Sequence, residues 1–536
     1  WITRGSAADS LVCYCLGISD VCPVRFDLYF RRFLNRERMN MNKLPDIDVD
    51  FPHDRKDDVV DLIFGKYGTE HAAVVGGFST FRARSAFAEV AKVLGVSEHQ
   101  VRRVTERIPF ARAQDLEGAT KRSIECGDLP LDEEPYATAM KLARFLDGFP
   151  RYPKMHPCGV VLSRAPMQDL VPCFTSEKGY ATTHFDMDGV EDIGLVKIDI
   201  LAQAGLAVMR DTKLALVDRG VAVDLGRLEP WEDQSVWDLV ASGQTRAVHH
   251  IESPAMVSLC RMCDARDIDA LIAVVSVIRP GAANQHKKQE FTRRHQGMEE
   301  VTYPHPSLAS CLRCTYGLIV YEEQVLQVCE AFAGLPPGDA DRLRRSLVKE
   351  DWDTVRSIGT AFHDCARRRG RTRDEIVDVW RFVCGFHGYA FCKAHSTAYG
   401  VEAYEAAWLK TSFPAEFMAA VLTHGKGFYH PLVYVLECAR LGIALAPPCV
   451  NDPGPAFAVR DGRIRVPALR AKGLSDRTCD RLVSEREREP FASLREFIRR
   501  VGPSGDESEV LLRAGAFDSF ASPLGAGRAR RTDLFW

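Results

Sequence analysis

The sequence predicts an α+β fold that is divided among several domains, and three observations lead to this prediction. The chain has 536 residues, and at roughly 150 residues per domain this length allows three to four domains. Apolar or strictly alternating runs, typical of strands, occur over 44–51, 158–163 and 194–201. From about residue 207 to about residue 450 the pattern becomes mainly helical. The strands are therefore expected in the first part of the chain and the helices mainly in the second.

Local patterns predict the order of elements along the first part of the chain. A helix is expected to begin at Ser10, and another with an aromatic face to run from Asp27 to Leu34. Residues 78–110 are predicted to be helical, because small and apolar side chains recur there at the spacing of one helix face. Ser97, followed three residues later by Gln100, forms a capping box for a second helix in this range.

Prolines mark the clearest linker in the second part of the chain. The run from Pro447 to Pro455 is rich in turn-forming residues and separates the long helical region from the C-terminal part of the chain. In this C-terminal part, charged helices are predicted over 477–489 and 494–500, so a small basic domain is expected there.

Composition excludes several classes of protein. Hydrophobic residues make up 46% and charged residues 27% of the chain, as in ordinary globular proteins. No run approaches the ~18 consecutive apolar residues of a transmembrane helix, and no signal peptide opens the chain, so we expect a cytoplasmic protein that binds no membrane. The first residue is Trp1 rather than Met, which indicates a fragment. The net charge of −3 argues against a uniformly basic surface but allows a local basic groove.

Two C-x-x-C pairs raise the possibility of a structural zinc site. They are Cys260 with Cys263 and Cys311 with Cys314, and the gap between the pairs far exceeds the usual ~15–20 residues. The first pair also lies in a stretch with helical character rather than in a tight knuckle. We therefore favour thiols that pack as small apolar side chains within helices.

The segment Pro45-Asp46-Ile47-Asp48-Val49-Asp50-Phe51 is the most informative in the chain. Side chains on a strand alternate between its two faces, so the three aspartates share one face and the apolar residues share the other, which can be buried. Acids only ~7 Å apart repel one another unless a cation compensates them, and a hard divalent cation prefers oxygen ligands. The alternative is a turn or a solvated edge strand, because Asp disfavours strands. The strict alternation makes the metal site the preferred interpretation.

A second strand carries a similar signal. In the run from Gly194 to Leu201, Lys197 and Asp199 share one face while the other face is apolar. A buried salt bridge between these two residues explains the pattern as well as a charged site does. Two nearby carboxylates joined by a third from a distant strand suit a two-metal centre for phosphoryl transfer, with Lys197 neutralising phosphate.

Five other segments could contact phosphates or bases, although solvated surface or a helix end explains each of them too. Gly5-Ser6 precedes a helix and offers backbone N–H groups to phosphate. The basic runs Arg342–Arg345 and Arg367–Arg373 could hold negative charge, and the aromatics of Gly388–Ser396 could stack on a base. The hairpin Lys472–Ser475 could present backbone N–H groups to DNA phosphates.

Longer motifs carry a resemblance to a known family. The chain resembles the bacterial DNA polymerase III α subunits, the C-family polymerases, over roughly residues 4–520. Matching segments in family order include RGSAADSLV, FLNRERMNMNKLPDIDVDF, HPCGVVLS, GLVKIDIL, TYGLIVYEEQVLQV, ADRLRRSLVKE, GYAFCKAHSTAYG and WLKTSFPAEFMAAVL. The resemblance implies a palm like that of polymerase β-type nucleotidyltransferases, a helical thumb, large helical fingers and a helix-hairpin-helix module. Their ranges would be 1–77 and 153–206 for the palm, 78–152 for the thumb, 207–452 for the fingers and 453–536 for the module and tail.

The same resemblance assigns roles to single residues. It implies that Asp46, Asp48 and Asp199 are the catalytic aspartates and hold two Mg²⁺ ions, whereas Asp50 matches the family pattern without being a ligand. The residues that it places against the nucleotide are Gly5, Ser6, Arg38, Lys197, Arg344, Arg345, Tyr389 and His395. The residues that it places against duplex DNA are Lys472, Gly473, Leu474 and Ser475.

The resemblance implies a template-directed DNA polymerase that adds deoxynucleotides to a primer 3′-OH. Its expected partners are primer-template DNA, deoxynucleoside triphosphates, and the sliding clamp or other replication and repair proteins. The phrases HHIESPAM and SVIRPGAA are closer to the error-prone branch, which acts in lesion bypass. The chain departs from the family pattern, for example at Cys392 and Ala394, where Asn and Ser are usual, and it lacks family domains at both ends. These departures leave open an alternative to an active polymerase. That alternative is a catalytically inactive DNA-binding fragment or paralogue.

Overall fold

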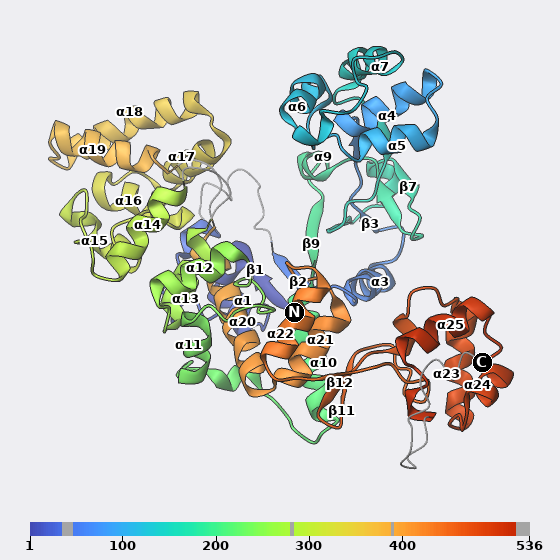
Figure 1. Cartoon of the computed structure of the whole chain (residues 1–536). Coiled ribbons are helices and arrows are strands. Elements are labelled where there is room, and N and C mark those ends of the chain that lie inside the picture. The colour runs from blue at the N-terminus through green and yellow to red at the C-terminus, as the bar shows by residue number, and fades with distance from the viewer. Residues whose placement is uncertain (35–46, 279–283, 387–390, 521–536) are drawn as a thin grey trace. The chain divides into compact units, whose positions relative to one another are not determined.

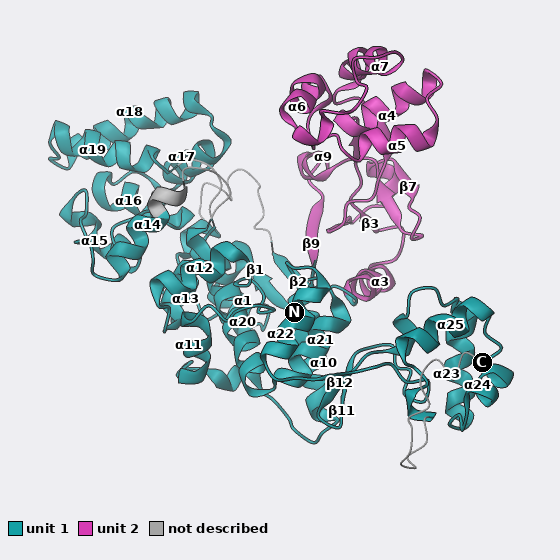
Figure 2. Cartoon of the chain, viewed as in Figure 1, with its two compact units in different colours: residues 1–55, 202–536 teal, residues 56–201 magenta. Residues whose placement is uncertain are grey.

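The computed structural model describes residues 1–34, 47–278, 284–386 and 391–520, with 284–287 described at the backbone only, and confirms the mixed α+β fold (Figure 1). The chain divides into two compact units, coloured in Figure 2, one of residues 1–55 with 202–536 and one of residues 56–201. We call them unit 1 and unit 2. Three residues with predicted roles, Arg38, Asp46 and Tyr389, lie outside the described residues.

Unit 2 is built on a sheet whose strands follow the order β9-β6-β3-β8-β7. Strands β6 and β9 are antiparallel, with Gly159 opposite Asp199, while β3 and β8 run parallel. Val75, Val161 and Val190 belong to a small core that packs in this unit. The strands confirm the β-rich runs predicted around residues 160 and 198. The sheet and its helices are β3 (Ala72–Val74), β6 (Gly159–Leu162), β7 (Cys173–Thr175), β8 (Ala181–Thr183), β9 (Val196–Gln203), α3 (Lys56–Tyr67), α8 (Met167–Leu170) and α9 (Met187–Asp192).

A helical subdomain completes unit 2, and its beginning corrects one prediction. Residues Phe78–Thr80 form strand β4, paired antiparallel with β5 (Pro150–Pro153), instead of starting a helix. Their β-branched and aromatic side chains favour a strand once a partner is available. Ser97 and Gln100 form the predicted capping box at the start of α5. The helices, which enclose a core around Phe87, are α4 (Ala83–Val93), α5 (Glu98–Thr105), α6 (Leu116–Arg122) and α7 (Tyr136–Ala143).

Unit 1 begins with two paired strands. Strand β1 (Ile2–Arg4) is antiparallel to β2 (Asp48–Pro52), with Arg4 opposite Asp48. A 3₁₀ helix, η1 (Gly5–Asp9), follows β1 directly, and Ser10 then caps α1 (Leu11–Cys15) by accepting a hydrogen bond from the N–H of Cys13, as the sequence predicts.

The helix expected from Asp27 to Leu34 is wrong. Only the short 3₁₀ helix η2 (Phe30–Arg32) forms there, and Asp27 has a φ of +48°, which is incompatible with a right-handed helix. Side chains of this segment instead contact distant parts of unit 1. Tyr29 donates a hydrogen bond to Glu330, and Arg32 pairs with Glu322 at 2.8 Å.

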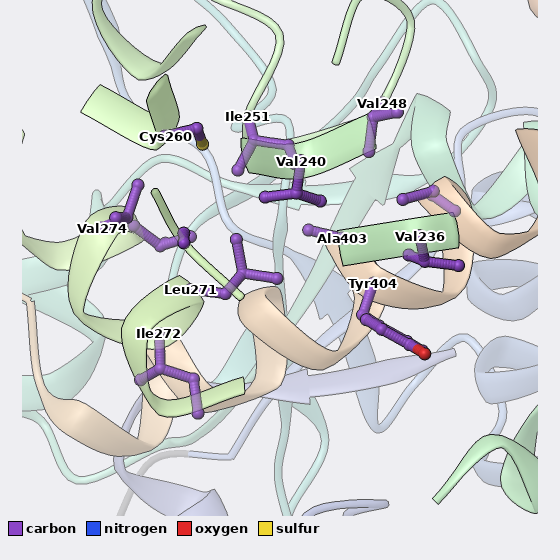
Figure 3. Packing of buried hydrophobic residues seen from close by; sticks show 14 of the residues in the cluster. Val236, Val240, Val248, Ile251, Cys260, Leu271, Ile272, Val274, Ala403 and Tyr404 are labelled. Carbon is purple, nitrogen blue, oxygen red and sulfur yellow. The ribbon is translucent and has the colours of Figure 1, made fainter. Parts of the chain in front are cut away.

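Helices dominate the rest of unit 1, as predicted, and eight of those that the structure describes share one large core. Helix α13 packs on α20, and α10 packs on α21. Figure 3 shows side chains of α11, α13 and α20 within this core, among them Val240, Leu271 and Tyr404. The helices are α10 (Ala204–Val217), α11 (Gln234–Ala241), α12 (Pro254–Cys263), α13 (Ile268–Val277), α14 (Asn284–His295), α20 (Lys393–Ser412), α21 (Pro414–His424) and α22 (Pro431–Arg440).

A second helical layer has its own core around Phe332 and Phe362. Here the basic run Arg367–Arg373 turns out to be partly structural. Arg369 donates to the carbonyl oxygens of Glu330 and Ala331, and Arg371 to that of Phe332, so both satisfy the carbonyl end of α16. The helices of this layer are α15 (Ala309–Leu312), α16 (Glu322–Ala333), α17 (Pro337–Lys349), α18 (Trp352–Arg368) and α19 (Arg373–Cys384).

The region predicted as a proline-rich linker is flanked by a small sheet. Strands β10 (Leu445–Ala446), β12 (Arg463–Arg465) and β11 (Ala458–Arg460) lie in that order, and β11 and β12 contact α21. The predicted charged helices come next along the chain. They are α23 (Asp476–Arg488) and α24 (Leu494–Val501), and α25 (Gly505–Ala514) joins them around Leu482, Phe497 and Leu511.

The two cysteines of the first C-x-x-C pair are packed in the large hydrophobic core of unit 1. Cys260 and Cys263 are both buried on α12, which confirms their helical setting, and burial raises the pKa of Cys260 to about 12. No three His, Cys, Asp or Glu side chains of the described residues gather in a way that could hold a metal ion. Among those same residues, none of the helices combines the length and apolar character that crossing a bilayer requires.

Candidate functional site

Strand β2 and the turn after β1 place Asp48 beside Gly5. Gly5 has a φ of +69°, and a Cβ atom added to it would lie 3.1 Å from Oδ2 of Asp48. A glycine therefore allows η1 to start directly against this carboxylate, where a side chain would be both strained and crowded. Ser6 follows on η1, so two residues predicted to contact the nucleotide lie in one unit with a predicted metal ligand.

Asp50, the third aspartate of the motif, is the buried residue of β2. It is 2% exposed, whereas Val49 and Phe51 on the opposite face are only half-buried. The Tyr399 hydroxyl donates to Oδ2 of Asp50 at 2.9 Å, and Nε of Arg4 lies 3.5 Å from Oδ1. Burial raises the pKa of Asp50, although Arg4 and Tyr399 oppose this shift. Asp50 thus connects the predicted catalytic strand to helix α20.

Tyr399 is the centre of a larger polar network beneath β2. Its hydroxyl also accepts a hydrogen bond from Nη1 of Arg4 at 3.1 Å, and its ring stacks on His250 with 3.8 Å between ring centroids. His250 and Gln203 both lie within 3.0 Å of a carboxylate oxygen of Glu402, whose side chain is 1% exposed. Within unit 1, the network joins β1, β2 and Gln203 to helix α20.

Sequence patterns gave almost no sign of this network. Tyr399 lies almost 350 residues from Asp50, and no local pattern couples them. One residue of the network did stand out in the sequence, namely Asp50. It alternates strictly with the two predicted ligands Asp46 and Asp48, but the pattern assigned no role to it.

Replacing Tyr399 with Phe is expected to lower the free energy of unfolding of unit 1 by about 1.5–3 kcal/mol, the usual contribution of a hydrogen bond to a charged group. The change removes one hydroxyl and leaves Asp50 buried beside Arg4 alone. Chemical denaturation of the variant and the parent measures the effect. Tyr67→Phe, on the exposed end of α3, is the control and should change little; equal stability of Tyr399→Phe and the parent would contradict this account.

His395, which was predicted to line the nucleotide pocket, lies in the first turn of α20. It is 9% exposed and packs between Phe391 and Tyr399, with ring centroids 4.9 and 4.2 Å away. Burial, with Arg4 and His250 nearby, lowers its pKa to about 3. His395 is therefore a neutral ring in an aromatic stack, suited to contact through its edge rather than to carry charge.

Lys197 and Asp199 lie on β9 in unit 2 and form the ion pair that was the alternative to a phosphate role. Nζ of Lys197 lies 3.2 Å from Oδ2 of Asp199 and 3.0 Å from Oε1 of Glu191. The other oxygen, Oδ1 of Asp199, is buried and accepts no hydrogen bond from any described residue. A buried carboxylate oxygen without a donor is costly. A divalent cation would satisfy it, so the oxygen chemistry of Asp199 fits a magnesium ligand.

The two arginines predicted to bind the triphosphate, Arg344 and Arg345, form ion pairs with acids of unit 1. Arg344 on α17 pairs with Glu322 at 2.7 Å and with Asp341 at 2.9 Å. Arg345 pairs with the same Asp341 at 3.3 Å, and 34% of its side chain is exposed. Both guanidinium groups are thus preorganised, and Arg345 is the more accessible of the two.

A second buried acid lies at the end of η1. Asp9 is 2% exposed, and neither of its carboxylate oxygens accepts a hydrogen bond from the described residues. Burial raises the pKa of Asp9 to about 8, and the neighbouring Glu323, itself buried, adds to the shift. The sequence did not single out Asp9, because an isolated Asp in a turn carries no signal of burial.

Asp9→Asn is expected to stabilise the chain, and the gain should grow as the pH rises. A carboxyl with a raised pKa keeps its proton in the folded state while the unfolded state has lost it, so stability falls between about pH 4 and pH 8. The loss approaches ~1.4 kcal/mol per pH unit within that window. Denaturation of both proteins at pH 5 and pH 7.5 measures the difference. Asp218→Asn, on an exposed turn, is the control; a gain that does not change with pH would contradict the assignment.

The predicted DNA-contacting hairpin is anchored to α25. Gly473 has a φ of +109°, and Lys472 and Gly473 are exposed. The N–H and hydroxyl of Ser475 both donate to Glu507, and these bonds lower the pKa of Glu507 to about 2. A short 3₁₀ helix, η9 (Ala468–Arg470), precedes the hairpin, and α23 follows it.

Each predicted site residue that the structure describes thus has its surroundings within one unit. Unit 1 brings together Gly5, Ser6 and Asp48 around the start of η1. Unit 2 contains Lys197 and Asp199, which contact each other. The joint placement of the three aspartates stays a prediction.

Comparison with known protein families adds three matches. Residues 2–202 match the model described as the bacterial DNA polymerase III alpha NTPase domain. Residues 206–370 match the bacterial DNA polymerase III alpha subunit finger domain, and residues 442–530 match a helix-hairpin-helix motif. The first match includes Asp46 together with Asp48 on β2 and Asp199 on β9, the three predicted aspartates.

Curated relatives align along nearly the whole chain. DNA polymerase III subunit alpha of Aquifex aeolicus is 32% identical over 96% of the chain and 46% of the relative. The protein of the same name from Pseudomonas aeruginosa is 34% identical over 96% of the chain and 45% of the relative. The error-prone DNA polymerase of Symbiobacterium thermophilum is 32% identical over 97% of the chain and 50% of the relative. The chain spans about half the length of these relatives.

Proposed function

We propose that this chain, which belongs to the family of bacterial DNA polymerase III α subunits, carries the nucleotidyl-transfer centre of a template-directed DNA polymerase. The observation that carries the proposal is the match of residues 2–202 to the family's NTPase domain, a range that includes Asp46, Asp48 and Asp199. The buried and unpaired Oδ1 of Asp199 supports it, because such an oxygen calls for a cation.

Asp46, Asp48 and Asp199 would hold two Mg²⁺ ions, which supply Lewis-acid stabilisation of an in-line displacement at the α-phosphate of a bound deoxynucleotide. Gly5 and Ser6 would offer backbone N–H groups and a hydroxyl to phosphate oxygens.

The cationic side chains would balance the charge of the nucleotide. Lys197 would balance charge beside Asp199, to which it is already paired. Arg344 and Arg345 would bind phosphate by exchanging their present partners, Glu322 and Asp341, for the nucleotide. These acids keep the guanidinium groups oriented until the nucleotide arrives.

The C-terminal module would hold the product duplex. Residues 442–530 match a helix-hairpin-helix motif, and exposed Lys472 and Gly473 sit on the hairpin with backbone N–H groups available to phosphates. Tyr389 and Arg38 complete the proposed nucleotide pocket by the family resemblance, together with His395. Sliding clamps and other replication or repair proteins remain proposed partners of the longer family members.

A primer-extension assay tests the proposal directly. The purified chain should add the template-matched deoxynucleotide to a primer 3′-end only when Mg²⁺ is present, and EDTA should stop the reaction. Gel-shift binding of the same primer-template without any Mg²⁺-dependent incorporation would overturn the proposal. It would instead support the alternative of a DNA-binding paralogue without catalysis.

We also propose that the polymerase is of the error-prone type. The phrases HHIESPAM and SVIRPGAA support this, and one relative bears that name, although relatives named as the polymerase III α subunit are equally similar. Extension opposite an abasic template site is the test. Bypass at a rate within about tenfold of that on an undamaged template would support the proposal, and a complete stop before the lesion would contradict it.

A further inference from the structure

A basic cavity in unit 1 is lined by none of the residues proposed above to act in polymerisation. It has a volume of about 790 Å³ and is lined by the loop after α11, helix α12 and helix α22. This volume lies within the range of pockets that bind organic ligands, ~300–1,000 Å³. Three arginines, Arg246, Arg261 and Arg440, line it together with a single acid, Glu437.

Charge in this cavity is not balanced by the protein. The carboxylate of Glu437 receives Nζ of Lys410 at 2.8 Å and Nη2 of Arg440 at 2.7 Å, and Nη1 of Arg246 approaches it to 3.8 Å. One negative charge therefore faces three cations. Lys410 is fully buried, and its ammonium also donates to two backbone carbonyl oxygens, so it is already fully coordinated. The surplus positive charge resides on the arginines, which face the cavity.

The arginines are held in place rather than free to move with solvent. Arg440 donates to the side chain of Gln244 at 2.6 Å as well as to Glu437, which fixes its guanidinium plane. Arg246 lies over the ring of Tyr429 at 5.8 Å. The stem of Arg261 lies against Gly243, where a Cβ atom would come within 2.5 Å of its Cγ. No carboxylate of the described residues forms an ion pair with Arg261.

The remaining wall combines apolar and polar side chains. Val257, Met262 and Tyr429 line it together with Gln244 and Ser258, so the cavity offers apolar side chains beside a cluster of guanidinium groups. Guanidinium groups bind phosphate oxygens in a bidentate manner, and an aromatic ring and a thioether pack well against a base. An inorganic phosphate alone would fill only a small part of this volume.

We propose that this cavity is a second nucleotide site that binds a nucleoside polyphosphate. The polyphosphate lies against Arg246, Arg261 and Arg440, and the base lies against Tyr429 and Met262. None of these residues is among those that the polymerase proposal uses, so the site is suited to sensing free nucleotides rather than to supplying the substrate.

Equilibrium binding of a fluorescent N-methylanthraniloyl ATP to the whole chain in EDTA tests the proposal. The double variant Arg246→Gln/Arg261→Gln should bind at least tenfold more weakly, because each lost guanidinium removes charge-assisted hydrogen bonds. Both side chains are exposed at the cavity mouth, so circular dichroism should show an unchanged fold. The matched control is Arg227→Gln/Arg356→Gln, which removes two highly exposed arginines elsewhere in unit 1 and should bind like the parent.

Competition and cross-linking locate the ligand and define its class. Pyrophosphate should displace the probe, a 5′-hydroxyl oligothymidylate should not, and 8-azido-ATP should label peptides within 243–262 or 429–440. Four results would each overturn the proposal. The probe does not bind, or it binds the double variant as well as the parent. The oligonucleotide but not pyrophosphate displaces it, or 8-azido-ATP labels only the 344–345 segment. Because binding is read without Mg²⁺, the outcome does not depend on whether the chain extends primers.

Discussion

Asp48→Asn is expected to reduce primer extension by a factor of about a thousand or more while leaving primer-template binding intact. The substitution replaces a carboxylate with an amide of the same shape, so it removes charge from the proposed metal site and little else. Lewis-acid stabilisation contributes several kcal/mol to such reactions, and ~4 kcal/mol corresponds to a thousandfold change in rate. The strand itself should persist, because β2 is held by β1 and by the bonds of Asp50.

Two measurements make the Asp48→Asn result specific. Single-turnover extension gives the rate, and gel shift gives the affinity for primer-template. Asp169→Asn is the matched control, since this exposed acid in unit 2 has no proposed role and should leave both quantities unchanged. Extension by Asp48→Asn at the parent rate would remove the assigned role, whereas loss of DNA binding together with extension would indicate a damaged fold.

Glu437→Gln is expected to cost about 3–5 kcal/mol of the free energy of unfolding of unit 1, the usual result of removing one partner of a buried ion pair. Lys410 has a fully buried side chain, and Glu437 is its acidic partner at 2.8 Å. Burial lowers the pKa of Lys410, and Glu437 is the group that opposes that shift. Without this carboxylate, α20 and α22 would hold a buried ammonium against Arg440.

Comparison of single and double variants identifies the cause of the loss. Chemical denaturation should show that Lys410→Met combined with Glu437→Leu regains much of the stability, because an apolar pair carries no desolvation penalty. Glu509→Gln, which breaks only an exposed pair with Arg513 on α25, should cost less than ~1 kcal/mol. If Glu437→Gln also cost less than ~1 kcal/mol, the buried ion pair would not be a major contributor to the stability of unit 1.

Local patterns in the sequence predicted those elements that depend on neighbouring residues. Ser10 and Ser97 cap helices in the predicted way, because a cap is a hydrogen bond within four residues. The alternation in the segments around Asp48 and Asp199 predicted strands at both places, and β2 and β9 form there. In β2, however, the buried residue is Asp50 rather than one of the apolar residues of the opposite face. The family resemblance then predicts roles for single residues, which alternation alone leaves open.

Other features depend on contacts between distant residues and were missed for that reason. The aromatic spacing from Asp27 suggested a helix, but Tyr29 and Arg32 are committed to glutamates on α16 about 300 residues away. Strands β10 to β12 are so short that only their pairing with one another defines them. Asp50 has no ligand role by the family resemblance, yet it is buried and its hydrogen bond from Tyr399 connects β2 to α20.

Anomalous scattering from Mn²⁺ tests the central claim most directly. Crystals of the chain with primer-template, a non-hydrolysable deoxynucleotide and Mn²⁺ in place of Mg²⁺ should show two peaks ~3.5–4 Å apart. Carboxylate oxygens of Asp48 and Asp199 should coordinate them at a little over ~2 Å, with Asp46 completing the set. Peaks that contact none of these residues, or an Asp199 carboxylate remote from both ions, would contradict the account.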